Sequence, residues 1–302
     1  TVATSAVRDA EDGPAFVRAV ERDAGLDVDI LSGEDEARLG GMGILSAFPK
    51  AEGLLGDLGG GSLELVRLSG GKIHEHATLP LGALRLNEIA AGGTDIKATI
   101  KDALGALDWL GEMSGQELYV VGGAWRALAR VHLAQRRYSL QVLDNYTVQP
   151  RAFRDFAKII GAQSDGALAK LPNFPVKRLN TVRPGALVLR QLIKVAAPKS
   201  LIFSAQGLRE GLLFDRLPAR LRREDPLHAA CAGISERFGR FKHLGPALAR
   251  WVAPVLADET DEEARLRLAA CLLGDIGWVD HPDARARLAF ERTMTIPVAG
   301  LN

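Results

Sequence analysis

The chain has 302 residues, a length that predicts two domains and leaves room for a third. Hydrophobic residues make up 47% and charged residues 25%, which excludes a largely disordered chain. The sequence contains no run of 18 apolar residues, so no membrane-spanning helix is predicted. Two cysteines, Cys231 and Cys271, exclude a disulfide framework, so we expect a reducing, cytoplasmic compartment. The sequence begins at Thr1 rather than at methionine and ends without a clear helix cap, so we expect a piece of a longer protein.

The formal net charge of +1 hides a segregation of charge along the chain. Residues 1–124 carry a net charge of −10, residues 125–223 one of +14, and residues 224–302 one of −3. An acidic first part beside a basic middle suits a site that binds metal ions together with a polyanion. It equally suits two surfaces that attract each other, and the pattern alone leaves both interpretations open.

The first third of the chain alternates between predicted strands and helices. Residues 2–7 are predicted as a strand, 9–24 as a helix closed by Gly25, and 28–31 as a second strand, so the two strands are expected to be parallel. Another helix is predicted from Ser32 to about residue 47. Strands over 54–58, 63–68 and 72–79 are separated by glycine turns, which predicts a hairpin meander.

Further along, helices are predicted over 97–113, 124–133, 150–170, 184–196 and 207–217, with strands at 117–121 and 200–203. Gly122 and Gly123 join a strand to a helix. This turn is interpreted either as an anion-binding site or as a tight packing turn. After a linker over 220–226, every segment is predicted as helical, with apolar residues at i, i+4 and i+7 from Leu227. We therefore expect an α/β part to about residue 217 and an all-α part after it.

The strongest local motif is DLGGGSLEL over residues 57–65. Three consecutive glycines let backbone amides turn inward as a nest for phosphate oxygens, and two carboxylates flank them as ligands for Mg²⁺. The motif is neither a Walker A loop nor a dinucleotide-binding fingerprint. The alternative to a phosphate-binding loop is a flexible hairpin turn without a binding function. The predicted phosphate-binding residues are Gly59, Gly60, Gly61 and Ser62, and the predicted metal ligands are Asp57 and Glu64.

A second motif, SGEDEAR over residues 32–38, has two interpretations. Ser32 and Asp35 are typical of a helix N-terminus, while one of the acids could act as a general base for water. On this segment alone, helix capping is favoured. Two arginines are further candidates for phosphate contacts: Arg8, which follows the first strand, and Arg209, a cation that the first turn of a helix does not favour.

Together these segments resemble the Ppx/GppA family of exopolyphosphatases and guanosine pentaphosphate phosphohydrolases. The matching segments, in the family's order and spacing, are 3–8 (ATSAVR), 31–38 (LSGEDEAR), 57–65 (DLGGGSLEL) and 207–211 (GLREG). The resemblance runs from residue 1 to about 217, and the tail is similar to the family's helical C-terminal domain. It implies an α/β, ribonuclease-H-like fold of the actin/hexokinase/Hsp70 superfamily.

The resemblance also implies roles for the motif residues. Glu36 is expected to be the water-activating base, which overturns the capping preference at this position. The glycine loop, Arg8 and Arg209 are expected to contact phosphates, and Asp57 and Glu64 to hold Mg²⁺. The implied reaction removes the terminal phosphate from inorganic polyphosphate or guanosine pentaphosphate, and the implied assembly is a homodimer. The basic segment 125–223 suits a long polyphosphate chain.

The sequence departs from the family pattern in two places. Leu63 stands where the family usually has threonine, and no Asp-x-Gly-Ser-Asn-Ser-type loop precedes Thr1. We therefore expect an N-terminal truncation. The expected domains are residues 1–38, the remnant of a first ribonuclease-H-like domain, residues 39–217, the second such domain, and residues 218–302, a helical C-terminal domain.

Three rival functions compete with the hydrolase. A nucleotide-binding module of the same superfamily needs an adenosine pocket near Gly122 and Gly123, which Trp125 is expected to crowd. A nucleic-acid-binding protein would use residues 125–223, but aromatic residues for base stacking make up only 6% of the chain, so nucleic acid is a disfavoured partner. The third rival is a catalytically incomplete fragment that binds polyanions.

Overall fold

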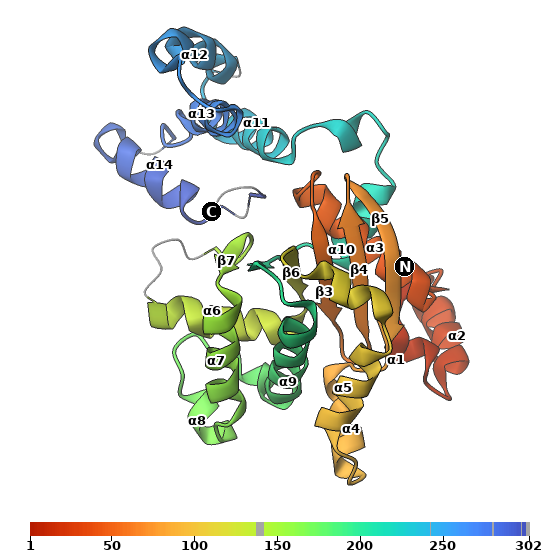
Figure 1. The fold of residues 1–302 in the computed structure, drawn as a ribbon. Coiled ribbons are helices and arrows are strands. Elements are labelled where there is room, and N and C mark those ends of the chain that lie inside the picture. The colour runs from red at the N-terminus through yellow and green to blue at the C-terminus, as the bar shows by residue number, and fades with distance from the viewer. Residues whose placement is uncertain (137–141, 242, 280, 297, 300–302) are drawn as a thin grey trace. The chain divides into compact units, whose positions relative to one another are not determined.

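The computed structural model describes residues 1–136, 142–241, 243–279, 281–296, 298 and 299. They belong to two compact units, one of residues 1–138 and 146–216 and one of residues 139–145 and 217–302. The first unit mixes strands and helices and the second is helical, as predicted (Figure 1). No described helix is long and apolar enough to cross a membrane. The predicted domain boundaries at residues 38 and 217 stay predictions.

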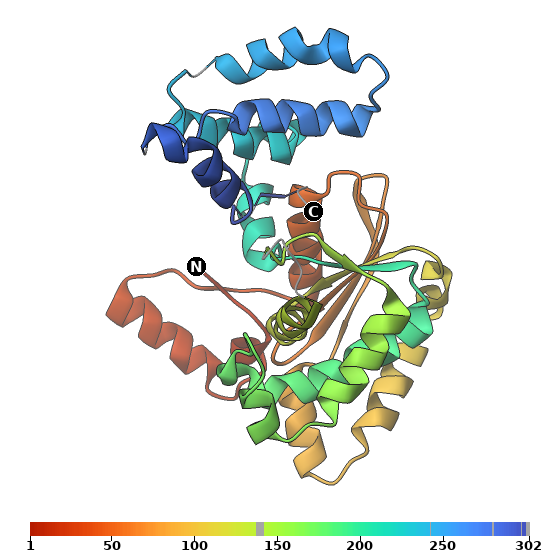
Figure 2. The ribbon, with the colours of Figure 1, turned by 90° about the vertical axis from the view of Figure 1, so that its left-hand side faces the viewer.

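The N-terminal residues form an arm beside the main sheet (Figure 2). Its elements are β1 (Val2–Ala3), α1 (Ser5–Arg8), α2 (Gly13–Ala24) and β2 (Asp29–Ile30). The two strands pair in parallel, as predicted, but the prediction of a strand over 2–7 is wrong beyond Ala3. Because β2 offers only two partner residues, a longer β1 would leave backbone groups unpaired, and the Thr4 carbonyl instead accepts from the amides of Val7 and Arg8.

A six-stranded mixed sheet forms the centre of the first unit. Its strands are β3 (Gly53–Leu58), β4 (Leu63–Ser69), β5 (Lys72–Leu79), β6 (Glu117–Val121), β7 (Tyr146–Val148) and β8 (Ser200–Phe203), in the order β5-β4-β3-β6-β8-β7. The predicted meander of β3, β4 and β5 is confirmed, whereas β7 was not predicted. Because β3, β6 and β8 are parallel, their carboxyl ends share one edge of the sheet.

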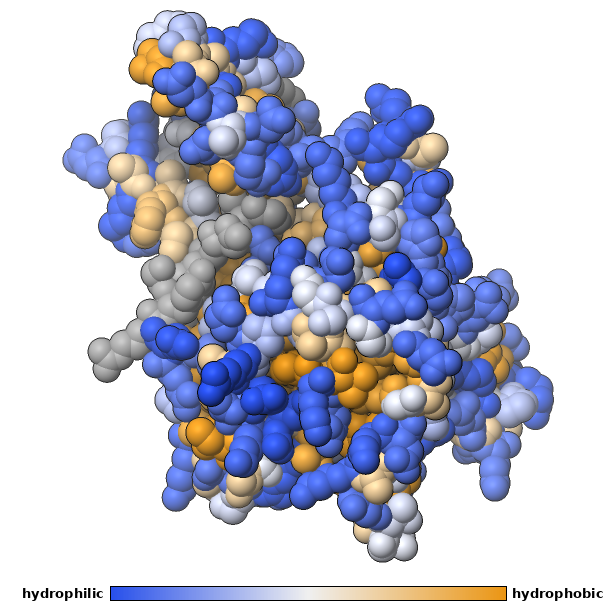
Figure 3. All heavy atoms as spheres, viewed as in Figure 1, coloured by the Kyte–Doolittle hydropathy of each residue, from blue (hydrophilic) through white to orange (hydrophobic). Residues whose placement is uncertain are grey.

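Helices cover both faces of this sheet. Leu55 belongs to a core with residues of α3 (Gly33–Ala47), whereas the neighbouring Gly56 lies against Trp125 of α6 (Gly123–Arg136) and Leu192 of α9 (Leu179–Ala196). Adjacent strand residues point to opposite faces, so α3 covers one face and α6 and α9 the other. Figure 3 shows a mainly hydrophilic surface on one side of the molecule, with hydrophobic side chains gathered toward the middle of the first unit.

Several helices differ from their predicted extents. The predicted helix over 97–113 is α5 (Ile96–Gly105) followed by a 3₁₀ helix (Asp108–Met113), and the one over 150–170 is divided into α7 (Pro150–Gly161) and α8 (Asp165–Ala169). α4 (Ala83–Ala91) was not predicted. α9 begins five residues before its predicted start and contains Pro184, which cannot donate to the Asn180 carbonyl four residues earlier. The Asn87 side-chain amide donates to that carbonyl instead, at 2.5 Å.

The second unit is built from α11 (Pro226–Phe238), α12 (Leu244–Val252), α13 (Asp261–Leu273) and α14 (Arg285–Thr293). Its core contains Leu227 and Cys231, with Ile234 and Phe238 packed against it, so the predicted apolar spacing is confirmed. Further 3₁₀ helices in the two units are Val176–Arg178, Leu221–Arg223, Ala253–Leu256 and Pro282–Ala284.

Two glycines let α3 pack closely against α10 (Leu208–Asp215). A Cβ atom at Gly43 would lie 2.2 Å from the Gly207 carbonyl oxygen, and one at Gly211 would lie 1.8 Å from the Leu39 carbonyl oxygen. Both obstacles are backbone atoms, which no side-chain rotation can move aside. The separation of the two helices is therefore set by the absence of side chains at these positions.

We expect Gly211→Ala to destabilise the chain by about 2–4 kcal/mol, because α3 and α10 must separate to admit the methyl group. Gly105→Ala is the matched control, since a Cβ there has no neighbour within 4 Å, and it should be neutral or stabilising by about 0.5–1 kcal/mol. Urea unfolding measures both. Equal effects of the two substitutions would show that the close helix contact is not a constraint.

Candidate functional site

Two acidic residues face each other at the end of the β3–β4 hairpin. Asp57 and Glu64 are cross-strand partners in the antiparallel register, which places both side chains on one face of the sheet. Glu64 is only 5% exposed, and its Oε1 atom is buried without a hydrogen-bond partner among the described residues. A buried, unpartnered carboxyl oxygen is costly, so Glu64 is a candidate ligand-binding residue.

Glu36 extends the cluster from the first turn of α3. It is 6% exposed and forms an ion pair with Arg8, whose Nη1 also donates to the Leu31 carbonyl at 2.6 Å. The capping interpretation holds for its neighbours, because Ser32 caps the helix by accepting from the Asp35 amide at 3.0 Å. Helix capping by Ser32 is therefore confirmed, and the role of Glu36 as a general base stays a prediction.

Burial and repulsion disfavour the charged forms of Asp57 and Glu64. Burial raises the pKa of Glu64 to about 8, and the charges of Asp57 and Glu36 act in the same direction. Burial likewise raises the pKa of Asp57 to about 6, with repulsion from Glu36 and Glu210 opposed by Arg126. The carboxyl groups of Glu36, Asp57 and Glu64 thus lie close together in a region of low dielectric constant, with Glu210 near Asp57. Such groups of buried acids are found more often at functional sites than elsewhere.

The glycine loop turns its carbonyls away from this cluster and into α4. The Gly59 carbonyl accepts from the Ala83 amide at 3.1 Å, and the Gly60 carbonyl from the Leu84 amide at 2.9 Å. The amides of Gly60 and Gly61, in contrast, have no hydrogen bond to any described part of the chain. The Ser62 side chain is buried and hydrogen-bonds to Glu64. The loop therefore keeps free donors for an anion, as the nest interpretation requires.

Arginines that the sequence analysis did not single out lie around the acids. Arg126, in the first turn of α6, is near enough to Asp57 to lower the pKa of that carboxyl group. The pKa of Arg126 is itself lowered, mainly by burial and also by the positive charges of Arg178 and Arg209. The Arg209 side chain is 79% exposed and forms an ion pair with Glu210 at 3.9 Å. The signal used for Arg209, a cation at a helix N-terminus, could have found Arg126 as well.

The Gly122–Gly123 turn is closely packed, and the side chain of Trp125 after it lies in the core. A Cβ at Gly122 would lie 2.3 Å from the Leu58 carbonyl oxygen. Trp125 is fully buried in the core, with its Nε1 donating to the Gly185 carbonyl at 2.8 Å, so it does not crowd a pocket at the turn. The guanidinium of Arg178 lies over Gly123 instead, because a Cβ there would be 2.5 Å from its Cζ.

The donors present fit a magnesium ion that keeps part of its water shell. Mg²⁺ is usually held by one or two carboxylates together with water and substrate phosphates. Asp57 and Glu64 supply two carboxylates, and the unpartnered Oε1 of Glu64 supplies an oxygen without another role. No group of three histidine, cysteine or acidic side chains suited to a metal occurs in the described residues, so a site with protein ligands alone is not formed there.

The chain is similar to known proteins along most of its length. Residues 1–220 match the Ppx/GppA phosphatase family, and residues 242–296 match the family described as exopolyphosphatase, C-terminal. Retrograde regulation protein 2 of Saccharomyces cerevisiae is 30% identical over 253 residues, which are 75% of this chain and 43% of the yeast protein. Exopolyphosphatase 1 of Mycobacterium tuberculosis is 27% identical over 227 residues, which are 71% of this chain and 66% of that protein.

A solved structure supports the fold. The crystal structure of an exopolyphosphatase from Cytophaga hutchinsonii has a TM-score of 0.62 at 19% identity, covering 70% of this chain and 72% of the other. This similarity, with the mixed sheet and its helices, confirms the predicted fold class. The chain spans less than two thirds of the length of the yeast and mycobacterial proteins.

We expect Glu64→Gln to stabilise the chain in magnesium-free buffer at pH 9 by about 2–4 kcal/mol, with little effect at pH 5. The pKa of Glu64 is raised in the folded state, so the folded chain holds a proton that the unfolded chain has released, and stability falls as pH rises from about 4.5 through 8. The amide side chain removes this dependence. Urea unfolding at both pH values measures it.

Glu88→Gln, on an exposed face of α4, is the control and should change neither the stability nor its pH dependence. Added Mg²⁺ should stabilise the parent chain and not Glu64→Gln. Loss of stability in Glu64→Gln at pH 9 would contradict the picture of a strained, unpartnered carboxylate.

Proposed function

The chain belongs to the Ppx/GppA phosphatase family, and from this premise we propose that it hydrolyses the terminal phosphoanhydride of a linear phosphate chain. The observation that carries the proposal is the convergence of three carboxylates, Glu36, Asp57 and Glu64, beside a loop with free amides. The substrate is inorganic polyphosphate or guanosine pentaphosphate, because both present a terminal phosphoryl group on a phosphoanhydride chain.

The glycine loop would hold the terminal phosphates. The free amides of Gly60 and Gly61 donate to phosphate oxygens, and the loop is fixed by its carbonyl contacts to α4, so little reorganisation accompanies binding. Arg209 at the rim is exposed enough to reach an arriving polyanion, and Arg8 is its counterpart on the arm. Both arginines would add charge-assisted hydrogen bonds to the substrate.

Asp57 and Glu64 would hold Mg²⁺ with water and substrate oxygens as the remaining ligands. When bound, the ion would supply positive charge against the oxygens of the transferring phosphoryl group. The charge of the ion would offset the repulsion between the two carboxylates, which adds to the larger effect of burial in raising their pKa values. Substrate phosphates, the cation and the acids therefore require one another in this site, which suits ordered or mutually dependent binding.

Glu36 would act on the attacking water. The water oxygen forms a bond to the terminal phosphorus, its proton passes to a Glu36 carboxylate oxygen, and the bond from phosphorus to the bridging oxygen breaks, so that the shortened chain leaves with the electron pair. Arg8 pairs with Glu36 and orients the carboxylate. Because hydrolysis is an in-line displacement, the position of Glu36 relative to the loop decides whether the water is aligned.

The Arg8–Glu36 ion pair also supports a second candidate, a chain that binds polyanions without hydrolysing them. In this arrangement the base is bound to a cation rather than free to accept a proton. The nucleotide-binding module has no comparable support, because Arg178 covers the Gly123 turn. Homodimerisation, which follows from the family resemblance, and a cytoplasmic location, which follows from the two unpaired cysteines, remain parts of the proposal.

We expect Glu36→Gln to reduce Mg²⁺-dependent phosphate release from long-chain polyphosphate by about 10²–10⁴-fold, while polyphosphate binding is kept. Glu34→Gln is the matched control, because Glu34 lies in the same helical turn with its side chain 80% exposed, and it should retain full release. Release and binding are measured in the same samples, with guanosine pentaphosphate as a parallel substrate.

The outcomes separate the candidates. Phosphate release that survives Glu36→Gln would overturn the role of Glu36. Binding of polyphosphate by parent and variant without release by either would establish the binding-only candidate. Absence of both would contradict the proposed function as a whole.

A further inference from the structure

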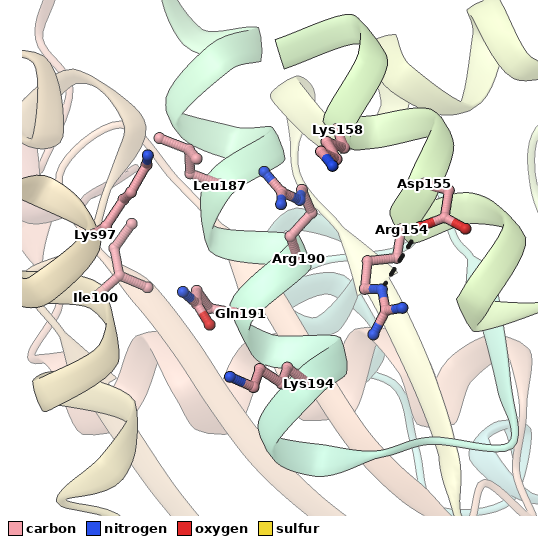
Figure 4. Close-up of a pocket in the computed structure, with 9 residues that line it drawn as sticks. All are labelled: Lys97, Ile100, Arg154, Asp155, Lys158, Leu187, Arg190, Gln191 and Lys194. Atoms are coloured by element: carbon pink, nitrogen blue, oxygen red, sulfur yellow. Dashed lines mark ion pairs between the residues drawn. The ribbon is translucent and has the colours of Figure 1, made fainter. Parts of the chain in front are cut away.

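A basic cavity opens between three helices of the first unit, apart from the acid cluster. It has a volume of about 390 Å³ and lies between α5, α7 and α9 (Figure 4). Five of its nine lining residues are cations and one is an acid. The cations are Lys97 of α5, Arg154 and Lys158 of α7, and Arg190 and Lys194 of α9.

These cations are not balanced by the protein itself. The acid, Asp155, lies 3.9 Å from Arg154 in an ion pair that Figure 4 draws. The side chains of Lys97, Lys158, Arg190 and Lys194 form no ion pair or hydrogen bond with the described parts of the chain. Four positive charges in excess therefore surround one cavity.

The spacing of these residues works against folding. Arg154 and Lys158 lie at i and i+4 on α7, and Arg190 and Lys194 lie at i and i+4 on α9, the helix against which α7 packs. Like charges at this spacing destabilise a helix, and here two such pairs face the same cavity. Lys158 and Lys194 reach solvent, whereas Arg154 and Arg190 are only partly exposed, one on each of the two helices that border the cavity.

Arg190 provides an independent observation. Its Nε atom is buried and has no hydrogen-bond partner in the described structure. A guanidinium donor that has lost water without gaining an acceptor is costly, and a bound anion would satisfy it. Figure 4 shows Arg190 at the centre of the lining, with the lysines around it.

We propose that this cavity binds an oligophosphate group. Several phosphates in a chain match four excess charges better than one monovalent anion would, and Arg190 offers the planar donors that phosphate oxygens accept from. The remaining lining is aliphatic or amide, without an aromatic ring on which a base could stack. The phosphates, rather than a nucleobase, are therefore the recognised part.

The cavity is separate from the glycine loop. Arg178 precedes α9 and lies over the Gly123 turn, whereas Arg190 is twelve residues further along the helix, roughly 18 Å at 1.5 Å per residue. One short oligophosphate therefore does not fill both places. The proposal does not depend on hydrolysis and applies equally to a chain that only binds.

Isothermal titration of the full chain with tripolyphosphate, in EDTA to exclude Mg²⁺, tests the proposal. The double substitution Lys158→Gln with Arg190→Gln should weaken binding at least 10-fold. The control double substitution, Lys50→Gln with Lys101→Gln, removes the same charge from exposed positions outside the cavity and should weaken binding less than 3-fold. Thermal unfolding verifies folding, and Lys158→Gln alone, at an exposed position, gives a second variant that preserves Arg190.

A residue-specific readout distinguishes this cavity from the glycine loop. The Arg190 side-chain Nε–H signal, assigned by its loss in Arg190→Lys, should shift on addition of tripolyphosphate. The affinities for GTP and for tripolyphosphate are compared to identify the source of the oligophosphate group. Equal affinities indicate an inorganic chain or any triphosphate, and a tighter GTP complex indicates a nucleotide. Either result supports an oligophosphate site.

Three results would overturn the proposal. Equal losses in the two double variants would mean unspecific charge attraction. Orthophosphate binding as tightly as tripolyphosphate would exclude recognition of a phosphate chain. Binding of a short single-stranded RNA without binding of tripolyphosphate would assign the cavity to nucleic acid.

Discussion

The close contact of α3 with α10 is the constraint on which the site depends. Backbone meets backbone at Gly43 and Gly211, so the two helices can be neither separated nor rotated without a loss of packing. α3 carries Glu36 at its first turn, and α10 carries Arg209 and Glu210 at its own. This backbone contact, together with the ion pair of Arg38 with Asp215 at 3.0 Å, sets the spacing of the two helix N-termini, so that residues far apart in sequence are held in a fixed relation.

The acid cluster is a strained arrangement that the hairpin holds in place. Asp57 and Glu64 are fixed opposite each other by the ladder of β3 and β4, and neither can turn away without exposing its strand neighbours, which are buried. The fold thus tolerates raised pKa values and an unpartnered oxygen at one position. Such local costs persist where surrounding structure determines them, and they prepare a site for ligands that the protein alone does not supply.

The predictions from the sequence were best where the signal was local. The meander and the place of the glycine loop as the turn between its first two strands were predicted correctly, because alternation and glycine turns act within a few residues. The strand beyond Ala3 was wrong because its length depends on β2, about 26 residues away, and the early start of α9 was missed because Asn87 satisfies the carbonyl that Pro184 frees. Arg178 could not be placed at the site from its sequence position, since only the tertiary packing of α9 brings it to Gly123.

The charge segregation along the sequence resolves into two different uses of the basic segment. Arg126 offsets part of the negative charge of Asp57, Arg209 pairs with Glu210, and Arg178 and Arg209 both lie near enough to Arg126 to lower its pKa. Around the cavity of α5, α7 and α9 the cations have almost no acids to offset. The first group lies beside acids, whereas the second leaves positive charge uncompensated. A net charge of +14 over residues 125–223 therefore does not describe one polyanion surface, and substitutions in the two groups should affect binding of phosphate chains through independent sites.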